Sequence, residues 1–230
     1  MATPRITQNY TLTGGTSVRG FLGSIAASGG MSMSNMYEAR FEGFSSNLEK
    51  SLGLAGFQNL NTNAGAYSAL TAFCEEASLP GMQAMTGSTT GVYMGEGAVN
   101  YAHTKSFTDI TLGWQCDANL LPLKFVNKWM GFIFGDENTT TKTIDRLKIN
   151  RVAYPEDYQC RLIIKKAERG ENDSLAGVGG IYTLHDVFPY SIQSTPVSYG
   201  SSTLLKVSAS FYYRRWEFEY ADIKKTRPNR

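Results

Sequence analysis

The sequence contains little charge. Only 18% of its 230 residues are charged, and 22 Lys and Arg against 20 Asp and Glu leave a formal net charge of +2. Proteins that bind nucleic acid avidly present a strong basic field over a patch or a whole domain. The composition therefore argues against tight DNA or RNA binding. It also argues against interpreting Arg214, Arg215 and their aromatic neighbours as a base-stacking surface.

Cysteine is scarce as well. Cys74, Cys116 and Cys160 are odd in number and lie far apart in the sequence. Such a set builds neither a full disulfide framework nor a Cys-x-x-Cys metal site. We expect three buried, reduced thiols, intracellular synthesis, no metal and no cofactor.

Histidine is scarcer still, which limits the available catalytic mechanisms. A Ser/His or Cys/His mechanism would have to use His103 or His185, and neither stands in a recognised catalytic motif. His185 is followed by Asp186 in a predicted strand, where neighbouring side chains point to opposite faces. A structural histidine is therefore the preferred interpretation over an acid/base role.

Long apolar runs are missing. No segment approaches the roughly 20 apolar residues that span a bilayer, and the first residues, MATPRITQNYTLTGG, lack the basic end and apolar core of a signal peptide. We expect a soluble protein that neither inserts into a membrane nor leaves the cell through a signal peptide.

Aromatic residues (12%) and glycines (23) are plentiful, which favours short strands and tight turns over a helical bundle. Residues 107–116 show the clearest strand alternation. One predicted face is apolar and the other mostly polar: Ile110, Leu112, Trp114 and Cys116 on the first, and Phe107, Asp109, Thr111 and Gln115 on the second.

The clearest helix is predicted over 119–134. Proline in its first turn (Pro122) and glycine just past its end (Gly135) are typical of helix boundaries. Its apolar stripe, expected to form the core, includes Phe125, Val126, Trp129 and Ile133.

Two adjacent glutamates stand in the segment FCEEASLPGM. A strand over 73–78 would end at Leu79-Pro80-Gly81, because the residue before proline is extended and glycine permits a turn. Regular alternation would place Glu75 and Glu76 on opposite faces, whereas paired carboxylate catalysis needs both on one bond. They are interpreted as solvated strand charges.

The remaining segments are less regular. Residues 35–44 fit a strand and a helix equally well, and 45–71 is a long loop with one short helix. The glycine-rich stretch GSTTGVYMGEG lacks the Gly-Lys-Ser/Thr of a phosphate loop and favours a loose hairpin. Three late strands follow over 158–168, 181–189 and 204–220, the last with a change of phase that predicts a bulge near Arg214 and Arg215.

The order of these elements, from about Ser34 to Tyr220, resembles the tail tube proteins of T4-like contractile-tailed bacteriophages. The resemblance is carried by three motifs taken in order: the strand ending in Leu79-Pro80, the strand Asp109-Ile110-Thr111-Leu112 feeding the helix with Lys124, Phe125, Val126 and Trp129, and the element Val187-Phe188-Pro189. Where the family carries an acidic residue in its closing strand, this chain has Arg214 and Arg215.

The resemblance implies a mainly β fold: a tail-tube β-sandwich or barrel with one flanking helix. It implies that 35–41 is the first strand. The chain would divide into an N-terminal arm (1–33), a β domain (34–221) with an insertion loop (45–71) and a hairpin for ring stacking (81–103), and a basic tail (222–230).

The resemblance also implies a structural virion protein and no enzyme. Six copies would form a ring, and rings would stack into the channel for genome delivery, which DNA crosses without specific binding. Sheath protein, baseplate and tail terminator are the expected partners. The alternatives are a baseplate tube-initiator ring, a secretion-system tube protein, or a β-sandwich hydrolase or carbohydrate-binding module that uses His103 or His185.

Two sets of residues are predicted to serve such a tube. Glu75 or Glu76 on a lumen-facing strand would repel phosphate. The adaptable hairpin would contact the next ring through Met82, Met85, Tyr93 and Met94.

Overall fold

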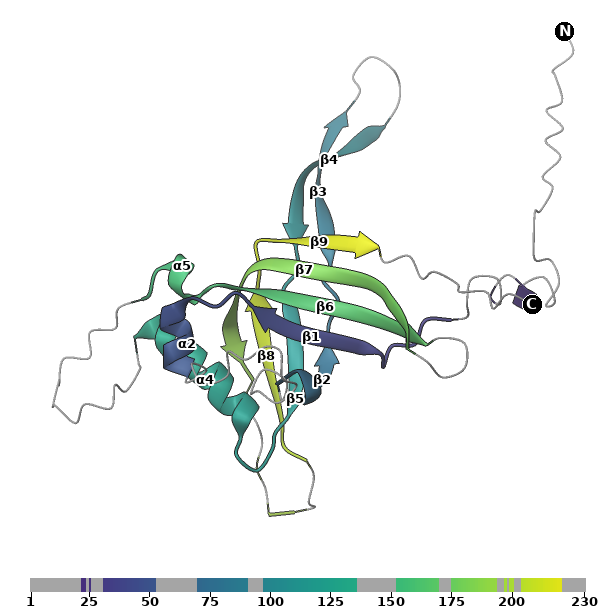
Figure 1. The fold of residues 1–230 in the computed structure, drawn as a ribbon. Helices are drawn as coiled ribbons and strands as arrows, with labels where there is room; N and C mark the ends of the chain where they lie inside the picture. The colour runs from purple at the N-terminus through teal and green to yellow at the C-terminus, as the bar shows by residue number, and fades with distance from the viewer. Residues whose placement is uncertain are drawn as a thin grey trace, which may run out of the picture.

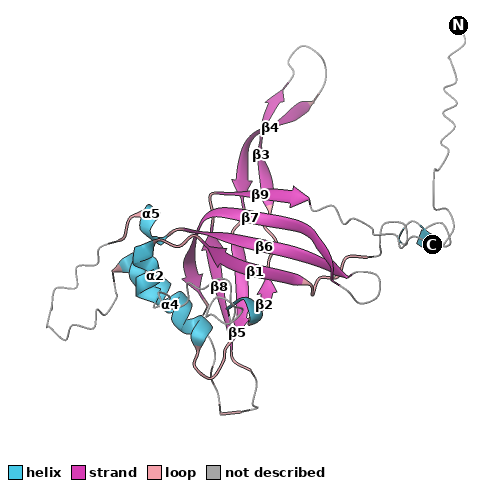
Figure 2. Ribbon diagram, in the orientation of Figure 1, coloured by secondary structure: helices cyan, strands magenta, loops and turns pink. Residues whose placement is uncertain are grey.

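The computed structural model describes residues 22–23, 25, 31–52, 70–90, 97–135, 152–169, 175–193, 197, 199–200 and 204–220. Strands dominate this part of the chain (Figure 2), as the composition predicts. In chain order the elements are β1 (Tyr37–Glu42), α2 (Ser46–Leu52), β2 (Cys74–Ala77), β3 (Met82–Thr90), β4 (Ala98–Phe107), β5 (Ile110–Gln115), α4 (Leu121–Phe134), α5 (Pro155–Tyr158), β6 (Cys160–Arg169), β7 (Leu175–Ile192), β8 (Lys206–Tyr212) and β9 (Arg215–Tyr220).

Several predicted segments lie wholly or largely outside the described residues. They are most of the 1–33 arm, most of the 45–71 insertion, the 222–230 tail, and Tyr93 and Met94.

The main sheet forms two layers that share β7. Its strand order is β1-β6-β7-β8-β5-β2, β9 also pairs with β7, and every pairing is antiparallel. The early part of β7 pairs with β6 and β9, and its end pairs with β8. In Figure 1 the first layer (β1, β6, β7, β9) runs across the second (β8, β5, β2), so one long strand joins both.

The sheet does not close into a barrel within the described chain. Its two ends, β1 and β2, approach each other, and Tyr37 Oη donates a hydrogen bond of 3.1 Å to the Cys74 carbonyl oxygen. No backbone ladder joins β1 to β2 among the described residues. Of the two predicted forms, sandwich or barrel, a single copy has the open one.

Phe41 lies at the centre of the core between the layers. Its ring centroid is 6.5 Å from that of Trp114 in β5, 5.5 Å from that of Phe211 in β8 and 5.5 Å from that of Trp129 in α4. Ala39 and Phe41 are both buried, and they pair with Ile164 and Leu162 of β6. This inward alternation confirms that the ambiguous segment is the first strand.

Helix α4 covers one end of the layers, and its ends follow the expected local signals. Leu121 N donates a hydrogen bond of 2.7 Å to Asp117 Oδ1, Pro122 stands in the first turn, and Gly135 ends the helix with a left-handed φ of 70°. The predicted apolar stripe, comprising Phe125, Val126, Trp129 and Ile133, is buried.

Two strand boundaries differ from the sequence expectation. Phe107 belongs to β4 and packs against Tyr213 with ring centroids 5.9 Å apart, whereas alternation had placed it on the polar face. Thr108 and Asp109 separate β4 from β5, and the alternation of inward and outward side chains does not continue across them. Strand β7 begins at Leu175 and ends at Ile192, so it is longer at both ends than the strand predicted over 181–189.

The predicted change of phase in the last strand is present. Tyr213 and Arg214 interrupt it between β8 and β9, so that odd positions face inward before the break and Trp216 faces inward after it. Opposite the break, Asp186 of β7 adopts a left-handed φ of 58°, and its Oδ2 lies 2.8 Å from Arg214 Nε. The ion pair therefore spans the point where both strands kink.

Candidate assembly surfaces

The outer side of the second layer is a face of small polar residues, here called the polar face. It lies opposite the buried Leu112, Trp114, Val207 and Phe211, because side chains alternate along β5 and β8. Its central residues are Thr111, Gly113, Gln115, Lys206, Ser208 and Ser210. The Thr111 and Ser210 hydroxyl oxygens are 3.3 Å apart across the two strands.

Glu75 and Glu76 both lie on the polar face, so the prediction of opposite faces is wrong. The register of β2 against β5 shifts between Cys74 and Glu76, which makes Glu75 the extra residue of a β-bulge. Lys206 Nζ donates a hydrogen bond of 2.7 Å to Glu75 Oε1. A Cβ atom added to Gly113 would lie 3.3 Å from the Glu76 Cβ.

The two glutamates differ electrostatically. The hydrogen bond from Lys206 lowers the pKa of Glu75, which stays ionised and forms an exposed ion pair. Lys206 compensates one of the two negative charges. Glu76 is the carboxylate that leaves the polar face net negative at this end.

A second polar group lies farther along the same face, and sequence reasoning missed it. Tyr190 and Tyr212 stack with ring centroids 4.0 Å apart and an interplanar angle of 20°. Tyr190 Oη donates a hydrogen bond to Asp109 Oδ2, which raises the pKa of the Tyr190 hydroxyl. Tyr212 alternates in step with Ser208 and Ser210 along β8. This alternation is the one sequence signal that could have placed Tyr212 on the polar face.

The second candidate surface is the hairpin formed by β3 and β4. It continues the β2–β5 ladder past Pro80, and Figure 1 shows it projecting from the body. Tyr213 Oη anchors its base by donating a hydrogen bond of 3.2 Å to the Gly81 carbonyl oxygen. Among the described residues, β3 and β4 pair only with each other.

Most hairpin side chains are exposed, including several apolar ones. Met82 and Met85, both predicted for ring stacking, are 54% and 53% exposed. Val99 and Tyr101, which were not predicted, are each 54% exposed. A strand pair this regular is more ordered than the loose hairpin expected from its glycines.

The two histidines lie on different strands, His103 in β4 and His185 in β7. His103 Nδ1 is on the exposed hairpin, 2.7 Å from Thr104 Oγ1. His185 Nε2 lies 3.5 Å from Glu217 Oε1, a carboxylate that also contacts Arg215 at 3.2 Å. These contacts are to a hydroxyl and to a carboxylate that Arg215 shares, and they support the structural interpretation.

The cysteines are less uniformly buried than expected. Cys160 is buried, while Cys74 and Cys116 are partly so. Burial raises the pKa of the Cys160 thiol well above its usual range and that of Cys74 to about 11. The thiolate form that reacts or binds metal is thereby disfavoured at neutral pH. No group of three or more potential metal-ligating side chains is found in the described segments.

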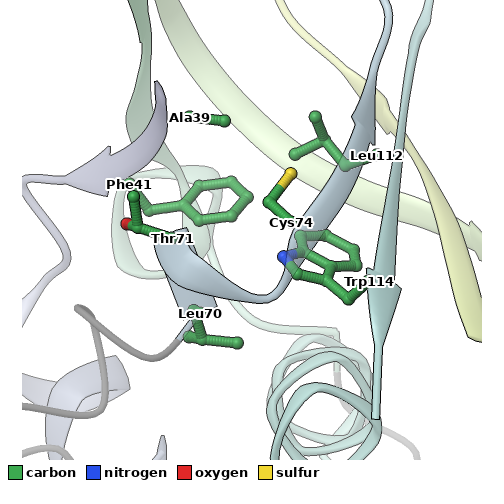
Figure 3. A pocket seen from close by; sticks show the side chains of 7 residues that line it. All are labelled: Ala39, Phe41, Leu70, Thr71, Cys74, Leu112 and Trp114. Carbon is green, nitrogen blue, oxygen red and sulfur yellow. The ribbon is translucent and has the colours of Figure 1, made fainter. Parts of the chain in front are cut away.

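Figure 3 shows a cavity beside Cys74, between the layers. Its volume is about 10 Å³, roughly the space that one water molecule needs. It is lined by Ala39, Phe41, Leu70, Thr71, Cys74, Leu112 and Trp114. A cavity of this size is a packing defect in the core and is too small to hold a substrate.

Within the described ranges, no helix combines the length and the apolar character needed to cross a bilayer.

Comparison with known proteins finds one family by sequence and two similar folds among solved structures. Residues 32–219 match the family model described as phage tail tube protein. A chain in the cryo-EM structure of the anti-feeding prophage baseplate is 11% identical, with a TM-score of 0.52 over 84% of this chain and 97% of that one. A chain in the extended sheath-tube complex of the PVC extracellular contractile injection system is 11% identical, with a TM-score of 0.50 over 90% and 100%. Both likenesses show the fold.

No curated protein is significantly similar to this chain in sequence.

Proposed function

The chain belongs to the phage tail tube protein family and is a structural tube protein, and from this premise we propose that six copies form a ring and that rings stack into the tube. It is a component of a phage or a phage-like particle. More specifically, we assign the chain to the tail of a contractile phage, with sheath protein, baseplate and tail terminator as its partners. The role is mechanical and needs no catalytic residue.

The observation that carries the proposal is the open second layer. It comprises β2, β5, β8 and the end of β7, and in the described chain β2 has a partner on one side only. An unpaired strand edge is a liability unless another chain covers it. Pairing β2 of one copy with the end of β7 in the next would remove both edges.

The diameter of such a ring can be calculated from its number of strands. Six copies of a four-stranded layer would give a barrel of about 24 strands, with a backbone diameter of roughly 45 to 50 Å and roughly 35 to 40 Å clear inside. A hydrated DNA duplex passes through that opening.

The polar face suits the inside of the channel. Its hydroxyls and glycine carry no charge, and Lys206 is engaged by Glu75. Phosphate contacts repeated ring after ring would hold the genome in place, so a lumen should offer few cations. Glu76 adds a negative charge that repels phosphate.

The hairpin suits contacts between stacked rings, since its exposed Met82 and Met85 can adapt to a partner surface. Tyr93 and Met94 remain proposals for the same contact.

Electron microscopy of the purified protein tests the proposal. We expect six-fold rings and stacked tubes from the intact chain, and rings that fail to stack after deletion of 86–97. Light scattering measures the mass of the particles, and circular dichroism checks that the shortened chain keeps its strands. A monomer at high concentration would contradict the ring, and tubes of normal length after the deletion would contradict the role of the hairpin. Single rings from the intact chain would favour a baseplate tube initiator.

A further inference from the structure

The strands of the second layer have two different ends. Strand β4 leads into Ile110 at the start of β5, so the hairpin leaves the layer at that end. Gln115, at the other end of β5, pairs with Lys206 at the start of β8. Cys116 N donates a hydrogen bond of 2.9 Å to the Leu205 carbonyl oxygen. The turn after β5 and the residues just before β8 therefore lie at the end opposite the hairpin (Figure 1).

Exposed apolar side chains gather at this opposite end. Leu120 lies in the turn between β5 and α4, and Val197, Tyr199 and Leu204 lie between β7 and β8. Val197 and Leu204 are 84% and 69% exposed, and Tyr199 is fully exposed. These four residues are here called the far rim. Apolar side chains that gather at one end of a molecule, and are left open in a single copy, indicate contact with another chain.

Leu120 combines a strained backbone with an exposed side chain. Its φ of 54° lies in the left-handed region, which a bulky side chain rarely adopts. The side chain is 37% exposed, so its burial within the single copy offsets only part of this strain. Strained residues persist where their surroundings or a function require them. A contact in the assembly that uses the Leu120 side chain would supply such a requirement.

The far rim and the hairpin both lie in segments with very few charges. The stretch 193–205 has no charged residue, and 82–107 has only Glu96 and Lys105, whose charges cancel. The cores of protein interfaces are depleted of charge, because an unpaired charge is costly to bury. The far rim and the exposed apolar side chains of the hairpin can therefore be buried against each other with little charge to desolvate.

The hairpin is longer than the strands that it continues. The nine residues of β3 span about 30 Å, whereas the six residues of β5 span about 20 Å. In a barrel the strands run from one rim to the other, tilted from the axis by about 35 to 45°. A hairpin of this length at one rim of a ring therefore reaches the ring that is stacked on it. Rings that stack with a single polarity bring the hairpins of one ring to the far rims of the next.

We propose that the far rim of each copy receives the hairpin of a copy in the adjacent ring, through the exposed apolar side chains of that hairpin. The inference rests on the proposed function, for which it names the surface that receives the hairpin. The two surfaces lie at opposite ends of the same strands, so every ring offers one set of each. A contact between two different surfaces of this kind repeats along a filament without limit. Contact between two hairpin ends would instead join two rings and stop there.

Photo-crosslinking at Tyr199 tests the contact directly. Tyr199 is replaced by p-benzoylphenylalanine, isotope-labelled and unlabelled copies are co-assembled, and the cross-linked peptides are mapped by mass spectrometry. We expect cross-links between copies that end in 82–90 or 98–107, in tubes but not in single rings. The same probe at Glu38, on the face of β1 opposite the buried Ala39, should not reach the hairpin. Cross-links that join parts of one copy, form in single rings or end elsewhere would overturn the inference.

Substitutions at the far rim should weaken stacking and leave the rings intact. Val197→Ser and Leu204→Ser should each raise the concentration for half-maximal tube assembly by about 5- to 10-fold, as expected for the loss of one buried aliphatic contact. Val152→Ser is the matched control, because Val152 is 61% exposed and lies past the C-terminal end of α4. Light scattering should find rings of normal mass for all three variants. Equal effects of the control and the far-rim variants, or loss of the rings, would contradict the docking.

Leu120→Gly separates docking from folding, because the two effects have opposite signs. Glycine adopts the left-handed conformation without strain, so the midpoint of urea unfolding should be unchanged or higher. Loss of the side chain should nevertheless raise the concentration for half-maximal tube assembly, as for Leu204→Ser. Normal assembly of this variant would contradict docking at the far rim.

The two proposals fail differently. If the intact chain forms no ring or tube, both are wrong. If tubes form but the probe at Tyr199 reaches a surface other than the hairpin, only the docking at the far rim is wrong.

Discussion

At the scale of single residues, Phe41 connects all parts of the core. It comes from β1 in the first layer, and its ring contacts Trp114 and Phe211 of the second layer and Trp129 of α4. Aromatic pairs of this kind add to the free energy of area burial. One side chain therefore holds two layers and a helix together.

Phe41→Ala should lower the free energy of unfolding by about 3 to 5 kcal/mol, because it removes a large buried ring and leaves a cavity. Urea unfolding followed by tryptophan fluorescence measures this loss under conditions that keep the chain monomeric. Phe134→Ala, which shortens a phenylalanine that is 48% exposed, is the matched control. It should cost about 1 kcal/mol or less. Equal losses in the two variants would contradict the central role of Phe41.

At the scale of elements, the hairpin and the β2–β5 ladder are one long strand pair that is interrupted between Ala77 and Met82 and has a register shift on each side of this gap. Thr108 N donates a hydrogen bond of 3.4 Å to the Gly81 carbonyl oxygen, and the ladder continues on both sides of it. The half next to β8 contributes Leu112 and Trp114 to the core, whereas β3 and β4 pair only with each other in the described part of the chain. In the proposed tube, this one element would belong to the monomer through β2 and β5 and to the assembly through β3 and β4.

Gly87→Ala should weaken assembly without destabilising the monomer. The new methyl group would lie 2.9 Å from the Tyr101 ring, which must then leave its place over the strand. We expect a change in unfolding free energy within about 0.5 kcal/mol, since the site is on an exposed hairpin. The concentration for half-maximal assembly should rise, because the displaced ring alters the hairpin surface that is proposed to contact the next ring. Ser88→Ala on the other face of the hairpin serves as the control, and unaltered assembly of the Gly87 variant would speak against this face as the stacking surface.

At the scale of the whole molecule, the polar face would decide how the proposed channel acts on its cargo. Glu75, Glu76 and Lys206 together carry one net negative charge per copy. Six-fold repetition in each ring, and stacking of many rings, would multiply any change at this site. A small local substitution thereby becomes a property of the entire tube.

Replacing both Glu75 and Glu76 with Lys should slow or block genome ejection while tube assembly survives. Three lysines per copy would then face the cargo, and phosphate contacts would add up along the tube. The measurement is the rate of DNA release from particles carrying the variant, with tube length checked by electron microscopy. Glutamine at both positions removes the negative charge without adding cations and should have a smaller effect. Unchanged ejection by the lysine variant would remove the polar face from the lumen.

Local chemistry made several features of this chain predictable from its sequence. Helix α4 follows from its apolar stripe and from Pro122 and Gly135, because helix hydrogen bonds and caps join residues a few positions apart. Alternation likewise predicted β5 and the change of phase after Tyr213. The order of such elements was enough to indicate the family.

The surfaces that matter for assembly were decided by tertiary structure. The bulge that brings Glu75 and Glu76 to one face depends on the register against β5, more than 30 positions away in the chain. The pairs Tyr190 with Asp109 and Tyr182 with Phe218 likewise join residues more than 30 positions apart in the sequence. Sequence periodicity records which side of its own strand a residue occupies. Which strands become neighbours, and in what register, is determined by the packing of the whole chain.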